Sequence, residues 1–308
     1  GNVGSAIINE LLKDGPHFNI TAIIRPTSTY TAPPNSSIIT KIADFTSLSS
    51  LADALEGHDA VANCISGGAT QFEPMKLIID AAIAAGVKFF FADEYVGNLM
   101  CDQFKRLPES FAGAKIRIRG YLEELGRQGK IQWTALNGGP FFDMWPAGFN
   151  IPARQARIYG TGNNPICWTP LPTIALAAAN MLRNPAPAIN RPIYINGVQN
   201  LTQNALLSAV ETVVGEKLTV EQVDVNKINK HALIALERGE IEKAMKGLTI
   251  SNQFYDGDNW SWEGVVMENE LVGVEPVSVE AAVEQAIEKW GKDCPVVEAM
   301  FRVEACDI

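Results

Sequence analysis

The sequence predicts an α/β fold with a doubly wound parallel sheet and a smaller C-terminal α+β region. Through the first half of the 308 residues, short apolar runs of strand length alternate with amphipathic stretches of helical period. The connections between them are mostly short, an arrangement typical of parallel strands with helices on both faces of the sheet. The alternation weakens after Pro152. We therefore expect one domain over residues 1–150 and a second region over residues 151–308, some segments of which return to the first sheet.

A glycine-rich helix start opens the sequence. Gly1, Asn2, Val3 and Gly4 lead directly into an amphipathic stretch over residues 6–13. In the turn G-x-x-G-x-x-G, glycines let the backbone approach a pyrophosphate, and the helix N-terminus binds the phosphates. Gly1 and Gly4 match the second and third glycines of this Rossmann-type turn. An ordinary helix that begins with glycine is the simpler alternative on this feature alone.

A buried strand precedes such a turn, and the sequence starts at Gly1 without one. In a doubly wound sheet that strand is central, so a sheet without it would be grossly destabilised. We therefore expect about ten more residues before Gly1 in the biological chain, or a chain that has been trimmed.

Arg25 follows the first expected strand, residues 19–24. About twenty residues after the glycine turn, an acidic residue would bind the ribose of NAD, whereas an arginine accommodates the 2′-phosphate of NADP. Arg25 therefore predicts NADPH as the cofactor. An arginine that merely ends a strand is the alternative. The next strand, residues 37–42, is followed by Asp44.

The remaining elements of the first domain continue the alternation. Thr46 or Ser47 caps the first of the helices that follow. The expected helices cover residues 48–55, 75–85 and 111–128, and the expected strands cover residues 59–65, 87–91 and 132–136.

Small and aromatic residues stand where two of these strands end. Ligands bind at the carboxyl ends of the strands in open parallel sheets. One strand leads into Ile65, Ser66 and Gly67, and another into Asn137 and an aromatic loop. Such a loop would cover a cofactor or an apolar ligand, although we expect about half of its aromatic rings to be core. The loop carries Pro140, Phe141, Phe142 and Trp145.

The second region is less regular. A turn over residues 257–262 contains Trp260 and Trp262. Thr202 and Ser278 are expected to cap two of the helices. Strands are expected over residues 156–162, 192–196 and 220–225, and helices over 171–182, 205–214, 227–246 with a break at Gly239, and 279–290.

Composition excludes several classes of partner. The net charge of −10 argues against nucleic acid and against an anionic membrane. No apolar run approaches about 18 residues, so we expect no membrane-spanning helix. The five cysteines form no C-x-x-C pair and the three histidines are scattered, so we expect reduced thiols, a cytoplasmic location and no metal.

Two common catalytic patterns are absent from the sequence. None of the six tyrosines has a lysine four residues later, so the Tyr-x-x-x-Lys pair of common short-chain dehydrogenases is missing. No G-x-S-x-G elbow is present either.

Four segments together resemble the isoflavone reductase-like group of atypical short-chain dehydrogenases, which overlaps the NmrA-like family. They are residues 1–4, Arg25, residues 93–97 (Asp-Glu-Tyr-Val-Gly) and residues 111–115 (Phe-Ala-Gly-Ala-Lys). The resemblance covers roughly residues 1–290 and is closest in style to fungal members. Residues 93–97 resemble the S-E-F/Y-G signature of the group, with Asp in place of Ser and an inserted Val.

The resemblance implies an NADPH-binding first domain, a C-terminal region that closes over an aromatic substrate, and one lysine as general base. Lys115 matches that lysine because it stands 18 residues after Gly97 and has Phe111 four residues before it. Desolvation beside a cationic nicotinamide would disfavour the charged ammonium, which lets the neutral amine act as a base. Lys115 could thus abstract a phenolic or acidic C–H proton, or it could protonate an intermediate while NADPH delivers hydride. A solvent-facing lysine beside Arg117 and Arg119 is the alternative.

The expected site has two parts besides the catalytic Lys115. The cofactor set is Gly1, Asn2, Val3, Gly4, Arg25, Asp44, Ile65, Ser66, Gly67, Lys115, Asn137, Pro140 and Phe141. The substrate set is Tyr95, Phe141, Phe142, Trp145, Trp260 and Trp262.

The resemblance thus predicts an NADPH-dependent reductase of a small aromatic or polyketide-type secondary metabolite. Two alternatives stay open. One is a non-catalytic redox sensor that binds NADP and a protein partner, and the other is an isomerase or cyclase that uses the same pocket. A homodimer also stays open.

Overall fold

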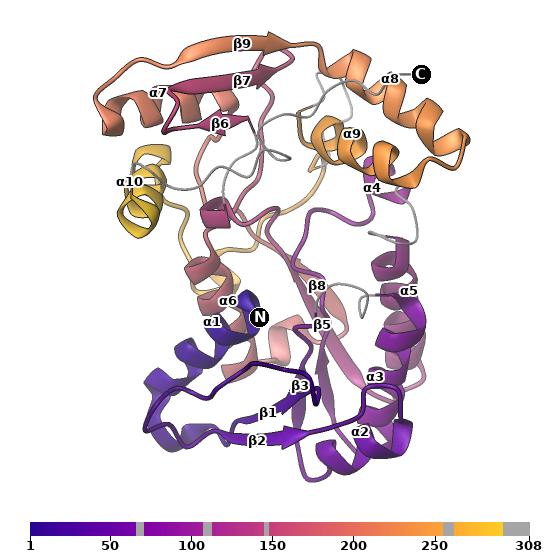
Figure 1. Ribbon diagram of the computed structural model, residues 1–308. Helices are drawn as coiled ribbons and strands as arrows, with labels where there is room; N and C mark the ends of the chain where they lie inside the picture. Colours follow the sequence, from indigo (N-terminus) through magenta and orange to yellow (C-terminus); the bar gives the residue numbers. More distant parts are fainter. Residues whose placement is uncertain (66–70, 107–112, 145–147, 255–261, 292–308) are drawn as a thin grey trace.

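The computed structural model of the chain describes residues 1–65, 71–106, 113–144, 148–254 and 262–291. In Figure 1 the chain forms a lower lobe around one parallel sheet and an upper lobe around a second, mixed sheet. Four residues of the expected site, Ser66, Gly67, Trp145 and Trp260, lie outside the described residues.

The central sheet of the lower lobe has four parallel strands in the order β3-β4-β5-β8. Phe91 lies opposite Ala62 on one side and Thr134 on the other, and Leu136 lies opposite Ile193. The strands are β3 (Ala60–Ala62), β4 (Phe89–Phe91), β5 (Gln132–Asn137) and β8 (Arg191–Tyr194).

Helices cover both faces of this sheet (Figure 1). Side chains alternate along a strand, so Phe89 and Phe91 pack in one core cluster while Phe90 packs in the other. Because all three rings are buried, β4 is enclosed on both faces, as in other doubly wound sheets. The predicted fold class is confirmed. On one face lie α1 (Asn2–Leu11) and α6 (Leu171–Arg183), and on the other lie α2 (Leu48–Leu55), α3 (Phe72–Ala84) and α5 (Ala114–Arg127).

The strands β1 (Thr21–Ile24) and β2 (Ile39–Ile42) form a separate two-stranded parallel sheet. Among the described residues, no strand is hydrogen-bonded between β1 and β3. In a doubly wound sheet the strand before the glycine turn belongs at this place. The break in the sheet therefore falls where the expected N-terminal strand would lie, and that strand stays a prediction.

The upper lobe contains a three-stranded sheet in the order β6-β7-β9 (Figure 1). β6 (Phe149–Asn150) is antiparallel to β7 (Gln155–Tyr159), whereas β9 (Thr219–Val223) is parallel to it. The division of the chain near residue 150 stays a prediction. The helices of this lobe are α4 (Asp102–Lys105), α7 (Gln203–Val214), α8 (Val225–Glu237), α9 (Ile241–Phe254) and α10 (Val279–Trp290).

Short 3-10 helices occur along the described chain outside these elements. They are η1 (Leu12–His17), η4 (Phe142–Met144), η5 (Ala186–Ala188) and η6 (Glu270–Val272).

The predicted boundaries hold for α2 and α10, and α7 ends as predicted but begins two residues earlier, at Gln203, because Thr202 is its N-cap. Side chains of Ser47, Thr202 and Ser278 each accept a hydrogen bond from a backbone N–H in the first turn of α2, α7 and α10. The break at Gly239, where φ is 75°, separates α8 from α9. These predictions succeeded because caps and glycine stops are local signals.

Candidate functional site

Three buried polar side chains follow neighbouring strands of the central sheet. Asn63, Asp93 and Asn137 follow or end β3, β4 and β5, and each is at most 5% exposed. Backbone hydrogen bonds from Asn63 N to Phe91 O (2.9 Å) and from Tyr95 N to Leu136 O (3.1 Å) extend the ladder beyond the strands. Since the strands are parallel, these side chains gather at one edge of the sheet.

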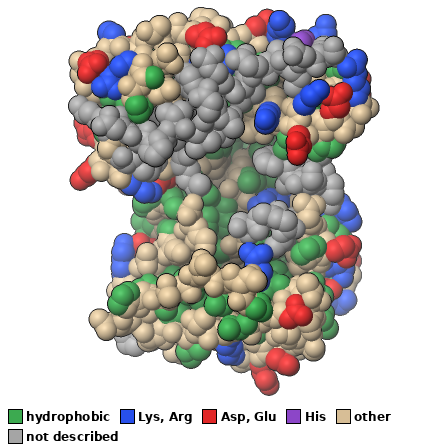
Figure 2. Space-filling model, viewed as in Figure 1, with side chains coloured by type: hydrophobic (Ala, Val, Ile, Leu, Met, Phe, Trp, Pro, Cys, Tyr) green, Lys and Arg blue, Asp and Glu red, His purple; other side chains and the backbone are tan. Residues whose placement is uncertain are grey.

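This edge faces the upper lobe, because the chain passes from β5 through η4 to β6 in that lobe (Figure 1). The start of α1 lies at the same level of the molecule (Figure 1). Figure 2 shows that the surface is hollowed between the two lobes. The carboxyl ends of the strands thus meet a recess, as ligand sites do in open α/β sheets.

The first turn of α1 packs tightly against the end of β3. A Cβ added at Gly4 would lie 3.2 Å from Cys64 Cβ. The first turn contains no acidic residue, and Gly1 makes no side-chain cap hydrogen bond. The first N–H groups of a helix have no partner within the helix and attract anions. This helix start therefore fits a bound pyrophosphate.

Lys115 lies in the first turn of α5 and reaches the segment after β4. Its Nζ donates hydrogen bonds to the carbonyls of Asp93 (2.7 Å) and Glu94 (2.8 Å). Nζ also lies 3.6 Å from Asp93 Oδ1, and the Lys115 side chain is only 12% exposed. The alternative of a solvent-facing lysine is wrong, although the catalytic role of Lys115 stays a prediction.

The carboxyl group of Asp93 has an unusual environment. Burial raises the pKa of Asp93 to about 6, against the opposing effect of Lys115 and with a smaller contribution from Glu94. Within the described residues, its Oδ2 is buried and has no hydrogen-bond partner. Unsatisfied buried acceptors are rare in native proteins and gather at functional sites.

Glu94 and Arg119 form a buried ion pair next to Lys115. Arg119 Nε donates to Glu94 Oε1 at 2.8 Å, Arg119 Nη2 pairs with Glu94 Oε2, and each side chain is 2% exposed. Asn137 Nδ2 donates to Glu94 Oε2 (2.8 Å), and Arg119 Nη1 donates to Tyr194 Oη (3.0 Å). Our sequence analysis missed this network. Its signal was the spacing of four between Lys115 and Arg119, which places both on one face of a helix.

Tyr95 adopts a strained conformation beside this network. Its φ of 41° lies in the left-handed region, which is uncommon for a bulky residue. The ring is 6% exposed and stacks on Phe91 with ring centroids 5.8 Å apart. Its Oη lies 3.9 Å from Cys64 Sγ. Such strain persists where the surroundings hold it, often at ligand sites.

The other residues of the expected cofactor set lie on the surface or at its margin. Arg25 directly follows β1, Asp44 stands two residues after the end of β2, and both are exposed. Asp44 accepts hydrogen bonds from the N–H and hydroxyl of Thr46, which lower its pKa. Ile65 is half-buried and Pro140 is exposed.

The expected aromatic pocket residues mostly pack inside the protein. Phe142 is 1% exposed and meets Trp168 edge-on, with ring centroids 6.3 Å apart. Trp262 is 4% exposed and meets Tyr194 edge-on at 6.2 Å. Phe141 is half-buried against the α1–α6 core cluster. Packing is the observed role of Phe142 and Trp262, and their place in a substrate pocket stays a prediction.

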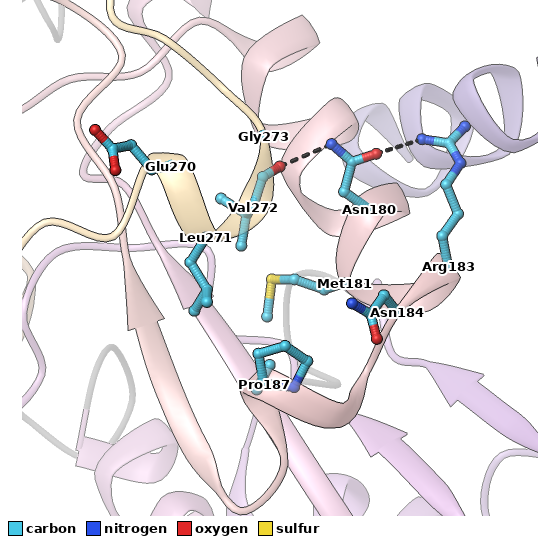
Figure 3. A pocket seen from close by; sticks show the side chains of 10 residues that line it. Asn180, Met181, Arg183, Asn184, Pro187, Glu270, Leu271, Val272 and Gly273 are labelled. Carbon is cyan, nitrogen blue, oxygen red and sulfur yellow. Dashed lines mark hydrogen bonds between the residues drawn. The ribbon is translucent and has the colours of Figure 1, made fainter.

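A separate pocket of about 300 Å³ lies between the C-terminal end of α6 and the η6 segment (Figure 3). Within it Asn180 Nδ2 donates to Val272 O (2.7 Å) and Arg183 Nη1 donates to Asn180 Oδ1 (2.6 Å). None of the expected site residues lines it. The lining residues are Asn180, Met181, Arg183, Asn184, Pro187, Ala188, Glu270, Leu271, Val272 and Gly273.

The fold and the helix start at the strand ends define a dinucleotide-binding α/β protein. Residues 1–157 match the family described as NAD(P)H-binding. The chain therefore belongs to the NAD(P)H-binding family, and the predicted nicotinamide cofactor is confirmed at this level. Among the described helices, none has the length and apolarity needed to cross a membrane.

Curated relatives are fungal oxidoreductases. Oxidoreductase aprR of Aspergillus flavus is 28% identical over 244 residues, which cover 78% of this chain and 80% of the relative. Oxidoreductase poxI of Penicillium oxalicum is 28% identical over 305 residues, which cover 94% of this chain and 91% of the relative. The chain is thus similar to fungal oxidoreductases along most of its length.

Solved structures of low sequence identity share the fold. The structure of AtPrR2 with NADP+ and (+)pinoresinol superposes with a TM-score of 0.72 at 19% identity, covering 93% of this chain and 96% of that one. An isoflavone reductase gives a TM-score of 0.64 at 18% identity, covering 93% and 95%. The quinone oxidoreductase QOR2 of Escherichia coli, complexed with NADPH, gives 0.67 at 19% identity, covering 92% and 96%. The resemblance to isoflavone reductase-like proteins is confirmed.

Proposed function

We propose that the protein is an NADPH-dependent reductase of a small aromatic or polyketide-type secondary metabolite. The observation that carries the proposal is the position of Lys115. Its ammonium group is held by the carbonyls of Asp93 and Glu94 at the edge of the sheet where the N-terminus of α1 begins. A nucleotide and a proton donor would thus meet at one place.

The nucleotide would be held by two features of the first domain. The start of α1 offers N–H groups to the pyrophosphate, and Gly4 allows the close approach of that helix to β3. Arg25 would pair with a 2′-phosphate and select NADPH over NADH. Structures of similar fold carry NADP+ or NADPH, which favours this choice. When bound, the cofactor supplies a hydride.

Lys115 would supply the proton that accompanies this hydride. A carbonyl substrate develops negative charge on its oxygen as the carbon is reduced, and a positioned ammonium stabilises that charge and then donates a proton. Tyr95, Phe141 and Trp262 are the aromatic residues we assign to the substrate side. The pinoresinol complex of similar fold supports an aromatic substrate.

Titration with NADPH and with NADH, followed by calorimetry, tests the nucleotide part of the proposal. We expect tighter binding of NADPH, and we expect Arg25→Ala to weaken NADPH strongly while leaving NADH within twofold. Lys41→Ala, a basic residue on the neighbouring strand β2 whose Nζ donates to Ala54 O, is the matched control. Failure of a folded protein to bind either nucleotide would overturn the proposal.

A substrate screen then separates the reductase from the sensor. Oxidation of NADPH with aromatic ketones or quinones supports the reductase. Tight NADPH binding without turnover of any such compound would favour the sensor. Consumption of substrate while the nicotinamide stays reduced would favour the isomerase or cyclase.

A further inference from the structure

The Asp93 carboxyl group lies close to Lys115, and its charge also affects Cys64 and Tyr95. Its Oδ1 is 3.6 Å from Lys115 Nζ, and its side chain is 7% exposed. Burial is the main reason why the pKa of Cys64 rises to about 12 and that of Tyr95 rises well above its usual range, and the Asp93 charge raises both further. The charge of Asp93 therefore affects the pKa values of two side chains that follow β3 and β4.

One oxygen of this carboxyl group has no partner. Asp93 Oδ2 is buried without a hydrogen bond among the described residues. An ionised carboxylate offers about four acceptor sites, whereas a protonated one also carries a donor. An oxygen in this position serves either a ligand or a proton that the protein takes up. The raised pKa of Asp93 agrees with the second role.

The Lys115 ammonium has one N–H group that no backbone carbonyl accepts among the described residues. Two of its three N–H groups are used by the carbonyls of Asp93 and Glu94, at 2.7 and 2.8 Å. The distance of 3.6 Å to Asp93 Oδ1 is too long for a hydrogen bond. The third N–H is therefore open to the Asp93 carboxyl group, whose Oδ1 lies 3.6 Å from Nζ, or to a substrate oxygen. The Asp93 carboxyl group thus lies next to the ammonium group that would donate the proton.

We propose that Asp93 relays a proton from water to Lys115 each time Lys115 protonates a reduced ketone substrate. The inference rests on the proposed reductase function. Hydride transfer forms the new C–H bond, oxidises the nicotinamide by two electrons and moves the C=O π electrons onto oxygen. That oxygen takes a proton from Lys115 Nζ. With Lys115 neutral, the Asp93 carboxylate takes a proton from water, and the carboxyl group then passes this proton to the Lys115 amine, so that both groups return to their resting charges.

The resting charges drive this relay in one direction. In the resting protein the Lys115 ammonium lowers the pKa of Asp93. Once Lys115 has given up its proton this opposing effect is gone, so the carboxylate binds a proton more readily. The other charge that faces the pair is Glu94, which is held by Arg119.

Infrared titration of the protein without nucleotide tests the relay directly. We expect a protonated carboxyl band that titrates with a midpoint near 6 in the wild type and is absent from Asp93→Asn. In Lys115→Met the midpoint should move upward. Asp80→Asn, which removes another carboxyl group paired with a lysine, should keep the band. A midpoint near the ordinary value of about 3.9, or one unmoved by Lys115→Met, would overturn the proposal.

Turnover supplies the second test. For Asp93→Asn we expect kcat to fall about 10- to 100-fold with the KM for NADPH within twofold. In the wild type kcat should decline as pH rises above the Asp93 titration, because fewer molecules carry the relayed proton, and this decline should vanish in the variant. Asp93→Glu should restore part of the rate. An unchanged pH profile in Asp93→Asn would sink the relay even if kcat fell.

The two tests separate failure of the relay from failure of the proposed function. The infrared midpoint needs neither cofactor nor substrate. A titration near 6 that shifts in Lys115→Met, in a protein that reduces no ketone, would support the proton-coupled pair and count against the reductase alone. An ordinary midpoint in an active reductase would do the reverse.

Discussion

Lys115 and Arg119 stand one turn apart on α5 and bind two consecutive residues after β4. Lys115 donates hydrogen bonds to the carbonyls of Asp93 and Glu94, and Arg119 donates hydrogen bonds to the carboxylate of Glu94. The main chain of this segment is therefore fixed from one helix face through both its carbonyls and a side chain. Tyr95, at φ 41°, directly follows the part that is fixed in this way.

The first prediction concerns this ion pair. Arg119→Met leaves the Glu94 carboxylate buried without its partner, which costs about 3–5 kcal/mol of unfolding free energy. Urea unfolding measures the loss. The double variant Glu94→Gln with Arg119→Met should recover part of it, since no unpaired charge then remains buried. A loss below about 1 kcal/mol in the single variant would show that the pair contributes no more than a surface pair.

The second prediction concerns the approach of α1 to β3. Gly4→Val places new carbon atoms against Cys64 Cβ, only 3.2 Å from where a Cβ would stand. The helix must move away from the strand end, so we expect NADPH binding to weaken at least tenfold. Gly120→Ala is the matched control, because Gly120 lies in α5 with nothing within 4 Å of its would-be Cβ. It should stabilise the protein by up to about 1 kcal/mol and leave binding unchanged.

The third prediction concerns the proton donor. Lys115→Met should lower kcat by about 100-fold or more, since general acid catalysis contributes roughly 10²–10⁴-fold. Binding of NADPH, measured by calorimetry, should change less than fivefold. Lys76→Met removes a lysine that pairs with Asp80 on α3 and should keep full activity. Retained turnover in Lys115→Met would show that the proton comes from another group.

The fourth prediction follows from the raised pKa of Asp93, about 6 against about 3.9 in the unfolded chain. Between these values the folded state binds more protons than the unfolded state, so stability falls as pH rises through this window. The destabilisation is complete above the folded pKa. The stability of Asp93→Asn relative to wild type should therefore be greater at pH 8 than at pH 3.5, by about 2–3 kcal/mol.

Chemical unfolding of both proteins across this pH range measures the difference. A difference that stays constant with pH would mean that Asp93 titrates alike in the folded and unfolded states. Asp80→Asn again serves as the control, because its carboxylate is partly exposed and hydrogen-bonded to Lys76 and Tyr121.

Local signals predicted much of the fold. The short apolar run over residues 87–91 predicted a strand, and Gly239 predicted a break in a helical stretch. Lys115 was selected through the resemblance to the isoflavone reductase-like group, in which its spacing from Gly97 matches, and its catalytic role stays a prediction. These features depend on neighbouring residues in the sequence, so a single sequence carries them.

The site required information that the sequence spreads over long distances. Glu94 meets Arg119 only because α5 packs across the end of β4, and Tyr194 reaches Arg119 only because β8 joins β5 after the chain has built β6 and β7. The loop after β5 does follow the carboxyl end of a central strand, yet Phe142 within it packs against Trp168. Aromatic character alone does not separate a pocket wall from a core.

The late arrival of β8 has a consequence for the way the molecule is assembled. A fragment that ends near residue 150 would lack both α6 and β8, and so would expose Leu136 and the rings of Phe89 and Phe91 on that face. Each lobe completes its hydrophobic interior only when the polypeptide has crossed between the lobes and come back. We therefore expect the two lobes to fold and unfold as one cooperative unit. A fragment that contains only one lobe should not fold on its own.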